Sequence, residues 1–406
     1  MKKNKFICIA LIVLLGATLT LAGCEDTTRQ IPGWDDTKQN VVFYTWGSSE
    51  ENLILQDIID EFESVAGNEN INVIIQKAGN DYYGDLELKL AGKQSPDIVL
   101  MKPGYIQPYL KSGAIISLQE YISKSTLIDE ASMIWDVNDG YRYNSATKVI
   151  GNSEDNIYAL IKDFSPDFVL NYNKNKVNNI VAQGSYPKED KTNFPSTTIP
   201  MTYSQFIDFA GAMQTADGKL MGTVLDNEPY QQLLEWIQQG GGSLYSADDR
   251  TVVDIKNTPS VRAAFDYYRM LRDETTNNPV FDSDNCAFTQ NNTALAISKL
   301  SSVQIGPGQL KQNQSATMFY GRWAYTAYNM NENVSACNIG FAPPPVPNGL
   351  TVKSDTKYAG ITAMVGMAIS AKSAQKEAAF KFMEYYFTKG MEGTAKIGYN
   401  IPGNKA

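Results

Sequence analysis

The sequence predicts an α/β protein that folds as two lobes, each built on a mostly parallel sheet. Between residues 41 and 101, strand-like runs rich in β-branched and aromatic residues alternate with amphipathic segments of helical period. Strand–helix–strand alternation is typical of parallel sheets with right-handed crossovers. The chain after its N-terminal segment has about 380 residues, which exceeds one ordinary hydrophobic core, so we expect two lobes.

Residues 1–23 are predicted to be an export signal rather than a folded element. The segment begins with three lysines and continues as an uncharged apolar run over residues 6–19. That run is shorter than the roughly 20 residues that a membrane-spanning helix needs. It ends in Leu21-Ala22-Gly23-Cys24, which resembles the lipobox of bacterial lipoproteins. An ordinary cleaved signal that happens to contain a cysteine is the alternative.

The lipobox resemblance implies cleavage before Cys24 and attachment of lipid to its sulfur. Two or three acyl chains would anchor the protein stably to the bilayer. The residues that follow, 24–39, are polar and include a Pro-Gly pair, so we expect a flexible tether.

The first element of the folded chain is a buried strand over residues 41–46, which ends at Gly47. Ser48 and Glu51 form a capping box, so a helix should begin here and run through residue 66. Trp46 therefore lies at the carboxyl end of the first strand, the edge where open α/β sheets bind ligands. The apolar face of the helix is expected to comprise Ile54, Ile58, Phe62 and Val65.

The later elements follow the same patterns of apolar period and turn residues. Further strands are expected at residues 71–76, 96–101, 156–161, 168–173, 339–347 and 360–370. Further helices are expected at residues 82–91, 109–122, 202–213, 229–238, 260–272 and 374–388.

Composition excludes several classes of function. Without the three signal lysines the chain has 32 basic and 44 acidic residues, a net charge of −12, which argues against a nucleic-acid partner. The absence of histidine excludes Ser-His-Asp and Cys-His catalysis and makes a transition-metal site improbable, so we expect no metal and no cofactor. The sequence leaves open whether Cys286 and Cys337 form a disulfide or remain free thiols.

Short segments spread over nearly the whole chain together resemble one family, the extracellular solute-binding lipoproteins of bacterial ABC importers, in the maltose-binding-protein-like, carbohydrate-binding group. Each segment is weak evidence alone, and their shared order is the signal. Besides the lipobox and the strand that ends in Trp46, they are Ser95-Pro96-Asp97-Ile98-Val99, Ile157-Tyr158-Ala159-Leu160, Asn171-Tyr172-Asn173-Lys174, Ile199-Pro200-Met201-Thr202-Tyr203, Glu228-Pro229-Tyr230, Tyr320-Gly321-Arg322-Trp323-Ala324, Ala342-Pro343-Pro344-Pro345 and Tyr358-Ala359-Gly360.

The resemblance implies the type II periplasmic-binding-protein-like fold, with the ligand in a cleft between two lobes. The N-terminal lobe would comprise residues 40–163 and 357–390. The C-terminal lobe would comprise residues 164–356 and 391–406.

Sugars present hydroxyls at the ring edge and C–H bonds on the ring face, so planar polar groups and aromatic faces suit them. By resemblance, Trp323 is the main stacking residue, Arg322 beside it donates to hydroxyls, and Glu228 and Tyr230 accept and stack. The remaining candidates are Trp46, Glu50, Lys102, Tyr105, Asp163 and Tyr358. Several have a structural alternative: Trp323 as a core residue, Glu50 and Glu228 at helix starts, and Asp163 as the cap of a turn.

The implied function is a lipid-anchored, monomeric binding protein on the extracytoplasmic face, which delivers a sugar or oligosaccharide to permease subunits of an ABC importer. One alternative keeps the fold but binds a peptide, polyol phosphate or polyamine. Phosphate is disfavoured because the opening helix begins with two glutamates. A cell-surface glycosidase with two carboxylates about 5 to 10 Å apart is the less favoured alternative. The expectation is therefore a binding protein and not an enzyme.

Overall fold

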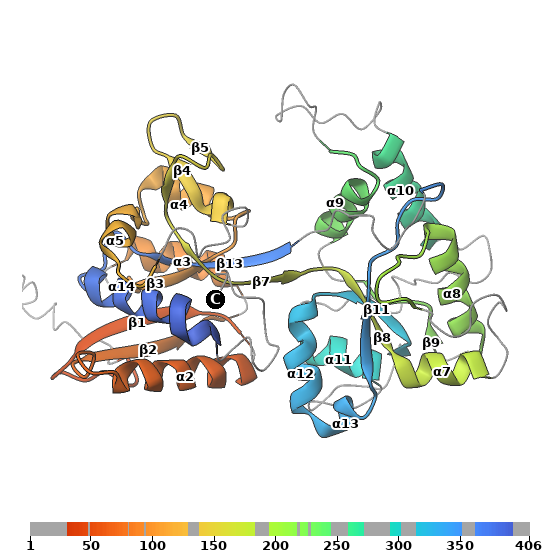
Figure 1. Cartoon of the computed structure of the whole chain (residues 1–406), viewed down its shortest axis with the longest axis horizontal. Helices are drawn as coiled ribbons and strands as arrows, with labels where there is room; N and C mark the ends of the chain where they lie inside the picture. Colours follow the sequence, from red (N-terminus) through yellow and green to blue (C-terminus); the bar gives the residue numbers. More distant parts are fainter. Residues whose placement is uncertain are drawn as a thin grey trace, which may run out of the picture.

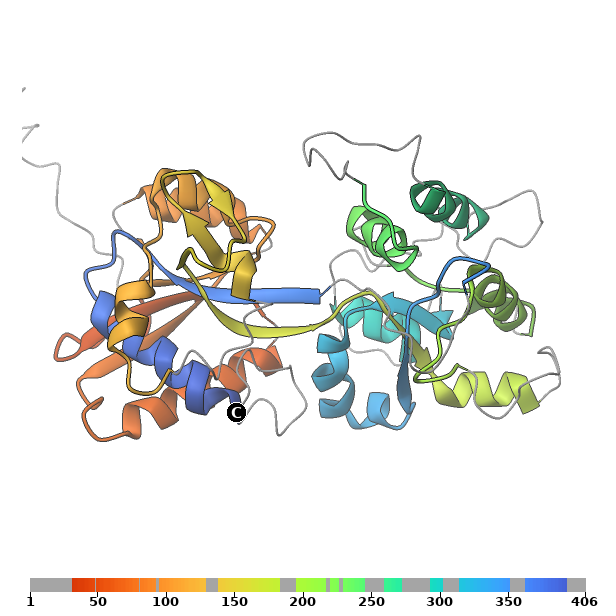
Figure 2. The same ribbon diagram turned by 45° about the horizontal axis from the view of Figure 1, so that its top comes forward.

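A computed structural model shows two lobes joined by a pair of strands (Figures 1 and 2). It describes residues 31–47, 49–79, 81–92, 95–128, 138–182, 195–216, 220–225, 229–244, 259–271, 293–301, 314–350 and 362–392. No helix within these ranges combines the length and apolar character needed to cross a membrane. The predicted signal segment and Cys24 lie outside them.

The first lobe is built on a five-stranded sheet in the order β2-β1-β3-β13-β7. Parallel pairing joins β1 to β2 and to β3, whereas β13 is antiparallel to both β3 and β7. The carboxyl ends of β1, β2, β3 and β7 therefore lie at one edge, which faces the second lobe. The bounds are β1 Gln39–Thr45, β2 Ile71–Lys77, β3 Ile98–Met101, β7 Leu160–Pro166 and β13 Thr362–Ile369.

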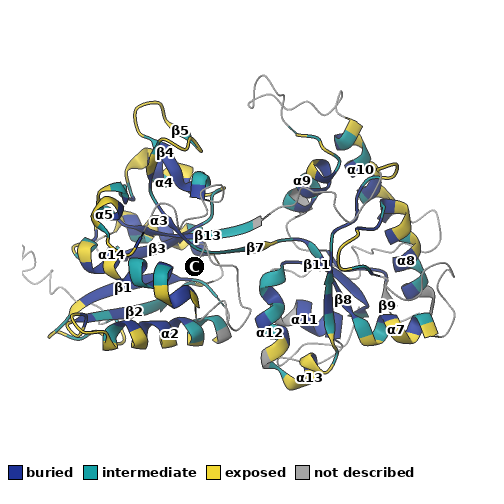
Figure 3. Cartoon of the chain, viewed as in Figure 1, coloured by how far each residue is buried: buried dark blue, intermediate teal, exposed yellow. Residues whose placement is uncertain are grey.

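Helices cover the first-lobe sheet and bury its apolar side chains in one continuous core (Figure 3). They are α2 Ser49–Ser64, α3 Tyr82–Ala91, α4 Gln107–Ser112, α5 Gln119–Lys124 and α14 Lys376–Tyr385, the last continued by a π-helical turn, η5 Tyr386–Gly390. A small antiparallel sheet adds β4 Arg142–Asn144, β5 Val149–Ile150 and β6 Asn156–Ile157 after the 3₁₀ turn η2 Asp139–Tyr141.

Two details of the first-lobe helices differ from the sequence prediction. The single helix expected over residues 109–122 is two helices, because Gly113 adopts a left-handed conformation (φ 68°) that ends α4. Val65, expected on the buried face of the first helix, is 42% exposed. The helix ends at Ser64, so Val65 no longer follows the helical period.

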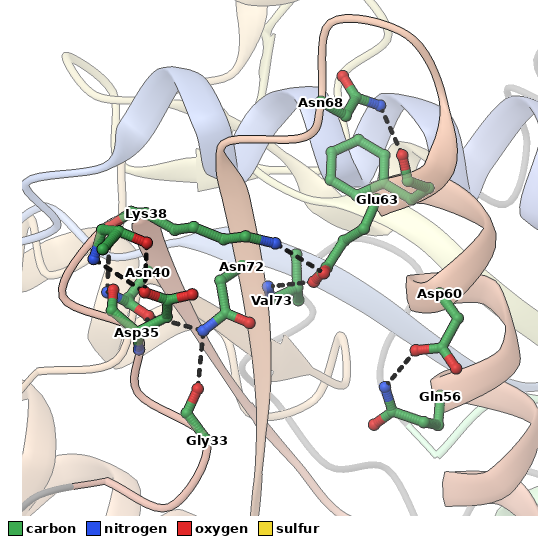
Figure 4. A network of polar contacts seen from close by, with 12 residues as sticks. Gly33, Asp35, Lys38, Asn40, Gln56, Asp60, Glu63, Asn68, Asn72 and Val73 are labelled. Atoms are coloured by element: carbon green, nitrogen blue, oxygen red, sulfur yellow. Dashed lines mark hydrogen bonds and ion pairs between the residues drawn. The ribbon is translucent and has the colours of Figure 1, made fainter.

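The residues before β1 are held on the first lobe by side-chain amides (Figure 4). The Asn72 amide donates to the Gly33 carbonyl (2.8 Å) and to Asn40 Oδ1 (2.7 Å), and the Asn40 amide donates to the Asp35 carbonyl (2.7 Å). The tether predicted at residues 24–39 is therefore wrong for its last part, because two amides in neighbouring strands bind that backbone.

The second lobe contains a three-stranded sheet in the order β11-β8-β12, in which β8 is antiparallel to both neighbours. A mostly parallel sheet was expected here. The strands are antiparallel instead, because β8 lies between two strands that run in the opposite direction. The bounds are β8 Val169–Asn173, β11 Thr317–Tyr320 and β12 Ile339–Ala342, with a separate parallel pair of β9 Leu220–Met221 and β10 Gln314–Ser315.

Two clusters form the core of the second lobe, and the larger buries Trp236. The helices are α7 Lys174–Ala182, α8 Tyr203–Ala216, α9 Pro229–Gln239, α10 Pro259–Leu271, α11 Thr293–Ser301, α12 Tyr325–Met330 and α13 Glu332–Ser335, with the 3₁₀ turn η4 Arg322–Ala324. Cys337 is a free thiol whose Sγ lies 3.3 Å from the Ser301 carbonyl oxygen. Cys286 lies outside the described residues.

The chain passes from β7 into the second lobe, and β13 lies beside β7 with Thr362 opposite Pro166 (Figure 2). Phe168, between β7 and β8, is buried and has a φ of 50°, a conformation rarely adopted by bulky residues. Met391 packs in the first-lobe core, although the sequence assigned residues from 391 onward to the second lobe. The helical backbone continues through η5, which carries Met391 back onto that core.

Candidate functional site between the lobes

Trp46 lies at the carboxyl edge of the first-lobe sheet, directly after β1, and is partly buried. Its ring meets Tyr82 edge to face, with centroids 4.5 Å apart and planes at 89°. Two backbone groups of neighbouring strands hold the Tyr82 hydroxyl, which accepts the Leu100 N–H (2.7 Å) and donates to the Tyr44 carbonyl (3.3 Å). Burial raises the pKa of Tyr82 well above its usual value, so this hydroxyl stays protonated.

The aromatic surface continues from Tyr82 to Tyr83 and then to Tyr105. Tyr83 and Tyr105 stack with centroids 4.1 Å apart and planes within 4°. Tyr105 is 44% exposed, so this pair presents an aromatic surface to solvent. Lys102 is also here, and its backbone N–H donates to the Tyr83 hydroxyl (2.9 Å). We call Trp46, Tyr82, Tyr83 and Tyr105 the first-lobe aromatic wall.

The structure thus brings together three predicted residues, Trp46, Lys102 and Tyr105, through two tyrosines that the sequence prediction missed. A signal for Tyr82 and Tyr83 was present, since they open the helix after the second strand. Asp81 caps that helix by accepting the Gly84 N–H (3.1 Å). Residues at such a helix start lie at the ligand-binding edge of the sheet.

Asp163 lies in β7 and pairs with the residue beside it, Lys162, at 2.5 Å. Adjacent strand residues normally point to opposite faces, but the register of β7 against β13 shifts between Val365 and Gly366. This β-bulge makes Lys162 the extra residue of β7 and allows the side chains of Lys162 and Asp163 to meet. Both are largely buried, at 11% and 13% exposed.

The surroundings of Lys162 favour its charged form. Burial by itself lowers the pKa of Lys162, but the negative charge of Asp163 and the neighbouring Tyr386 and Glu51 outweigh it and raise the pKa above its usual value. The Lys162 ammonium also lies 5.9 Å from the centre of the Tyr386 ring. Asp163 is therefore a member of an ion pair at the start of the crossing between the lobes.

On the second lobe, the turn η4 carries Arg322 and Trp323 and contacts β7. Trp323 is partly buried and packs on Tyr320, with centroids 4.7 Å apart and planes at 53°. The Arg322 guanidinium lies 5.3 Å from the centre of the Tyr325 ring, within cation–π distance. Helix α12, which follows η4, contacts α2 of the first lobe. The predicted stacking residue therefore lies beside the crossing between the lobes.

The other predicted residues cannot be compared with the structure. Glu228, Tyr358 and Cys24 lie outside the described residues, as do the side chains of Glu50 and Tyr230. Among the described residues, no group of three or more Cys, Asp or Glu is arranged to hold a metal ion.

A cavity of about 520 Å³ opens in the second lobe between α12, α13 and β12. Lys174, Tyr325 and Phe341 are among its lining residues, but none of the predicted ligand residues lines it. We place the candidate site between the lobes because the first-lobe aromatic wall lies at the sheet edge that faces the second lobe, and Trp323 lies beside the crossing.

The architecture defines the class of protein: two α/β lobes joined by paired strands, with aromatic residues of each lobe beside the junction, the type II periplasmic-binding-protein-like fold. The family comparison agrees with the expectation from sequence. The model of the bacterial extracellular solute-binding protein family matches residues 46–392, and the chain belongs to that family. No curated protein sequence matches the chain.

Solved structures of similar fold cover about nine-tenths of the chain. An ABC substrate-binding protein from Listeria monocytogenes in complex with cycloalternan has a TM-score of 0.67 at 20% identity and covers 91% of this chain and 81% of its own. A solute-binding protein from Thermotoga lettingae bound to α-D-tagatose has a TM-score of 0.67 at 16% identity, and the match covers 91% of this chain and 82% of the other. UgpB from Mycobacterium tuberculosis in complex with glycerophosphocholine has a TM-score of 0.65 at 17% identity, and the match covers 91% of this chain and 80% of the other.

Proposed function

We propose that the protein is the lipid-anchored substrate-binding component of an ABC importer, and that it captures a sugar or oligosaccharide between its lobes for delivery to membrane permease subunits. Family membership supports the binding role, and the solved structures of similar fold include complexes with saccharides. The observation that carries the sugar assignment is the pair of aromatic surfaces: the first-lobe aromatic wall and Trp323. Aromatic faces complement the C–H faces of sugar rings.

The mechanism follows from the position of the two surfaces. A ligand held on one lobe reaches the other only when the lobes close, so ligand contacts favour the closed form over the open one. Closure occurs at the crossing formed by β7 and β13. The permease would then accept the closed form. The assigned ligand residues include Glu228, Tyr230 and Tyr358. The lobe boundaries are those expected from sequence, except that Met391 belongs to the first lobe.

Ligand class is tested by a thermal-shift panel, since a bound ligand raises the melting temperature. The panel contains cycloalternan, maltotriose, β-1,6-galactobiose, D-tagatose and D-mannitol, with glycerophosphocholine as the contrasting compound. We expect the largest shift from an oligosaccharide. A shift with glycerophosphocholine alone would overturn the sugar assignment and favour a choline cation stacked on the aromatic wall.

The stacking role is tested by Trp323→Ala, which should weaken binding of the best panel compound at least tenfold, about 1.4 kcal/mol. Trp34→Ala is the matched control, because the Trp34 side chain is exposed and its indole N–H donates to the nearby Asp36 carboxylate (3.1 Å). Calorimetry that gives equal affinities for Trp323→Ala and wild type would contradict the assignment.

Two further measurements address anchoring and the enzyme alternative. The lipid anchor predicts that the wild-type protein sediments with membranes whereas Cys24→Ala does not; equal sedimentation would contradict it. A binding protein returns oligosaccharide intact after long incubation, and cleavage products would instead support a glycosidase.

A further inference from the structure

The glycine before the predicted stacking turn is required by its surroundings and not by its backbone. Gly321 has φ −67° and ψ 143°, a conformation that any residue adopts. However, a Cβ added there would lie 1.9 Å from Nε1 and 2.2 Å from Cδ1 of the Trp323 indole. The indole therefore folds back over Gly321 and occupies the space that any other side chain would need.

A second side chain shares that space. The same added Cβ would lie 2.6 Å from Oδ1 of Asp167, so the Trp323 indole and this carboxylate both border Gly321. Asp167 belongs to the crossing between the lobes, one residue after the end of β7. Its Oδ1 accepts the backbone N–H of Phe168 (3.2 Å), the residue held in the left-handed conformation. One carboxylate thus lies against the indole and bonds the most strained backbone position of the crossing.

We propose that Asp167 is a positioning residue that couples Trp323 to the crossing between the lobes. The indole lies in the space left by the missing side chain of Gly321, and Asp167 holds it there. Asp167 also holds Phe168 in the conformation that sets the lobe orientation. Ligand stacked on Trp323 restrains the indole and, through Asp167, the Phe168 amide. This inference rests on the proposed function, because it assigns Trp323 the stacking role.

The test uses Asp167→Ala, Asp167→Asn and Gly321→Ala in the full chain, with maltotriose as probe or the panel compound that gives the largest thermal shift. Asp167→Ala should weaken binding about fivefold, the order expected when a side-chain bond to a backbone amide is lost. Asp167→Asn should restore most of that loss, because its amide oxygen still accepts the Phe168 N–H. Gly321→Ala should weaken binding in wild type, and clearly less so in a Trp323→Ala background, where the added Cβ meets only the Asp167 carboxylate of the two side chains.

The hydrogen-exchange rate of the Phe168 amide separates coupling from a purely structural role, which would not make that rate respond to ligand through Asp167. Ligand should slow exchange of the Phe168 amide in wild type and in Asp167→Asn, but not in Asp167→Ala. Without ligand, Asp167→Ala should speed exchange at this amide while the β8 amides beyond it keep their wild-type rates. Wild-type exchange at Phe168 in Asp167→Ala would overturn the inference, as would additive effects of Gly321→Ala and Trp323→Ala.

The two hypotheses fail in different ways. If Trp323→Ala binds as tightly as wild type, the stacking assignment of the proposed function is wrong. If Trp323→Ala weakens binding while Asp167→Ala and Gly321→Ala do not, only the coupling through Asp167 is wrong. A fall in the melting temperature of Asp167→Ala without any change at Phe168 would make Asp167 structural and would also overturn the coupling.

Discussion

A buried carboxylate and a buried ion pair of the first lobe contrast with a buried amide in helix α9 of the second lobe. In the first lobe, buried Asp97 accepts the Val42 N–H (2.8 Å) and the Ser373 hydroxyl (2.5 Å), and Lys162 pairs with Asp163. In the second lobe, α9 buries Gln232 at 1% exposed, and neither polar atom of its amide has a hydrogen-bond partner among the described residues. Buried polar groups with partners fix one arrangement, whereas those without partners cost free energy.

The first-lobe contacts tie separate elements together. Asp97 ties β1 to Ser373 in the turn before α14, and Lys162 and Tyr386 tie β7 to η5. Helix α9 contains the predicted ligand residue Tyr230, and its Gln232 amide has no such tie among the described residues. The ties at Asp97 and Lys162 should therefore contribute more to stability than the Gln232 amide does.

The largest effect is expected at the ion pair of the first lobe. Lys162→Met leaves the Asp163 carboxylate largely buried without its cation, and breaking a buried pair in this way costs about 3 kcal/mol. Because folding raises the pKa of Lys162, the stabilisation is complete below the usual value of 10.5 and is lost only as the pH rises beyond it. Urea unfolding at neutral pH measures the loss.

Lys124→Met is the matched control for Lys162→Met. Lys124 lies at the same 2.5 Å distance from Glu120, but both side chains are exposed, at 71% and 76%. Exposed pairs contribute little to stability, so this variant should unfold like wild type. Equal losses in the two variants would mean that burial is not what gives the Lys162 pair its strength.

A smaller loss is expected at Asp97. Asp97→Ala leaves the buried Val42 N–H without an acceptor, which costs about 2 kcal/mol. Asp97→Asn keeps an oxygen for that N–H and can donate to Ser373, so it should stay close to wild type. Equal stability of the Ala and Asn variants in urea would contradict this role.

Asp97 should also make stability depend on pH. Burial raises the pKa of its carboxyl above the usual 3.8, against the opposing hydrogen bonds from Ser373 and Val42. The folded protein therefore holds this proton more tightly than the unfolded chain, and stability falls as the pH rises through the range above 3.8. Asp97→Asn should lack this decline, which unfolding at a series of pH values would detect.

The smallest effect, of opposite sign, is expected at Gln232 in the second lobe. Gln232→Met replaces an amide without partners by an apolar side chain of similar size, and should raise the free energy of unfolding by about 1 kcal/mol. Gln205→Met is the contrast, because Gln205 accepts the Thr202 N–H (2.8 Å) and should lose stability. A loss of stability in Gln232→Met as well would contradict the view that the Gln232 amide is a cost to the fold.

Local patterns predicted most of the fold. The alternation of strands and helices was predicted from apolar period, and so was the burial of Ile58 and Phe62 on the first helix. The β-bulge at Lys162 was not predicted, because it depends on pairing with β13, about 200 residues further along the chain. Gly113 could have been recognised as a helix stop, whereas nothing local indicates the left-handed Phe168.

The candidate site was predicted less completely. Trp46 and Tyr105 were identified from their places after strands, and the structure joins them through Tyr82 and Tyr83. Those two tyrosines were missed because the sequence does not show which rings meet across the sheet edge. Asp167 was missed for the same reason, since its neighbour Gly321 lies 154 residues away.

The strand order of the first lobe has a consequence for the sequence of events during synthesis. Strand β13 lies between β3 and β7, yet it is made only when residues 362–369 leave the ribosome. The first lobe therefore begins first and finishes last, while the described second-lobe elements, all between residues 169 and 342, can assemble earlier. Until β13 arrives, β3 and β7 each have an unpaired side, which is the state most exposed to misassembly.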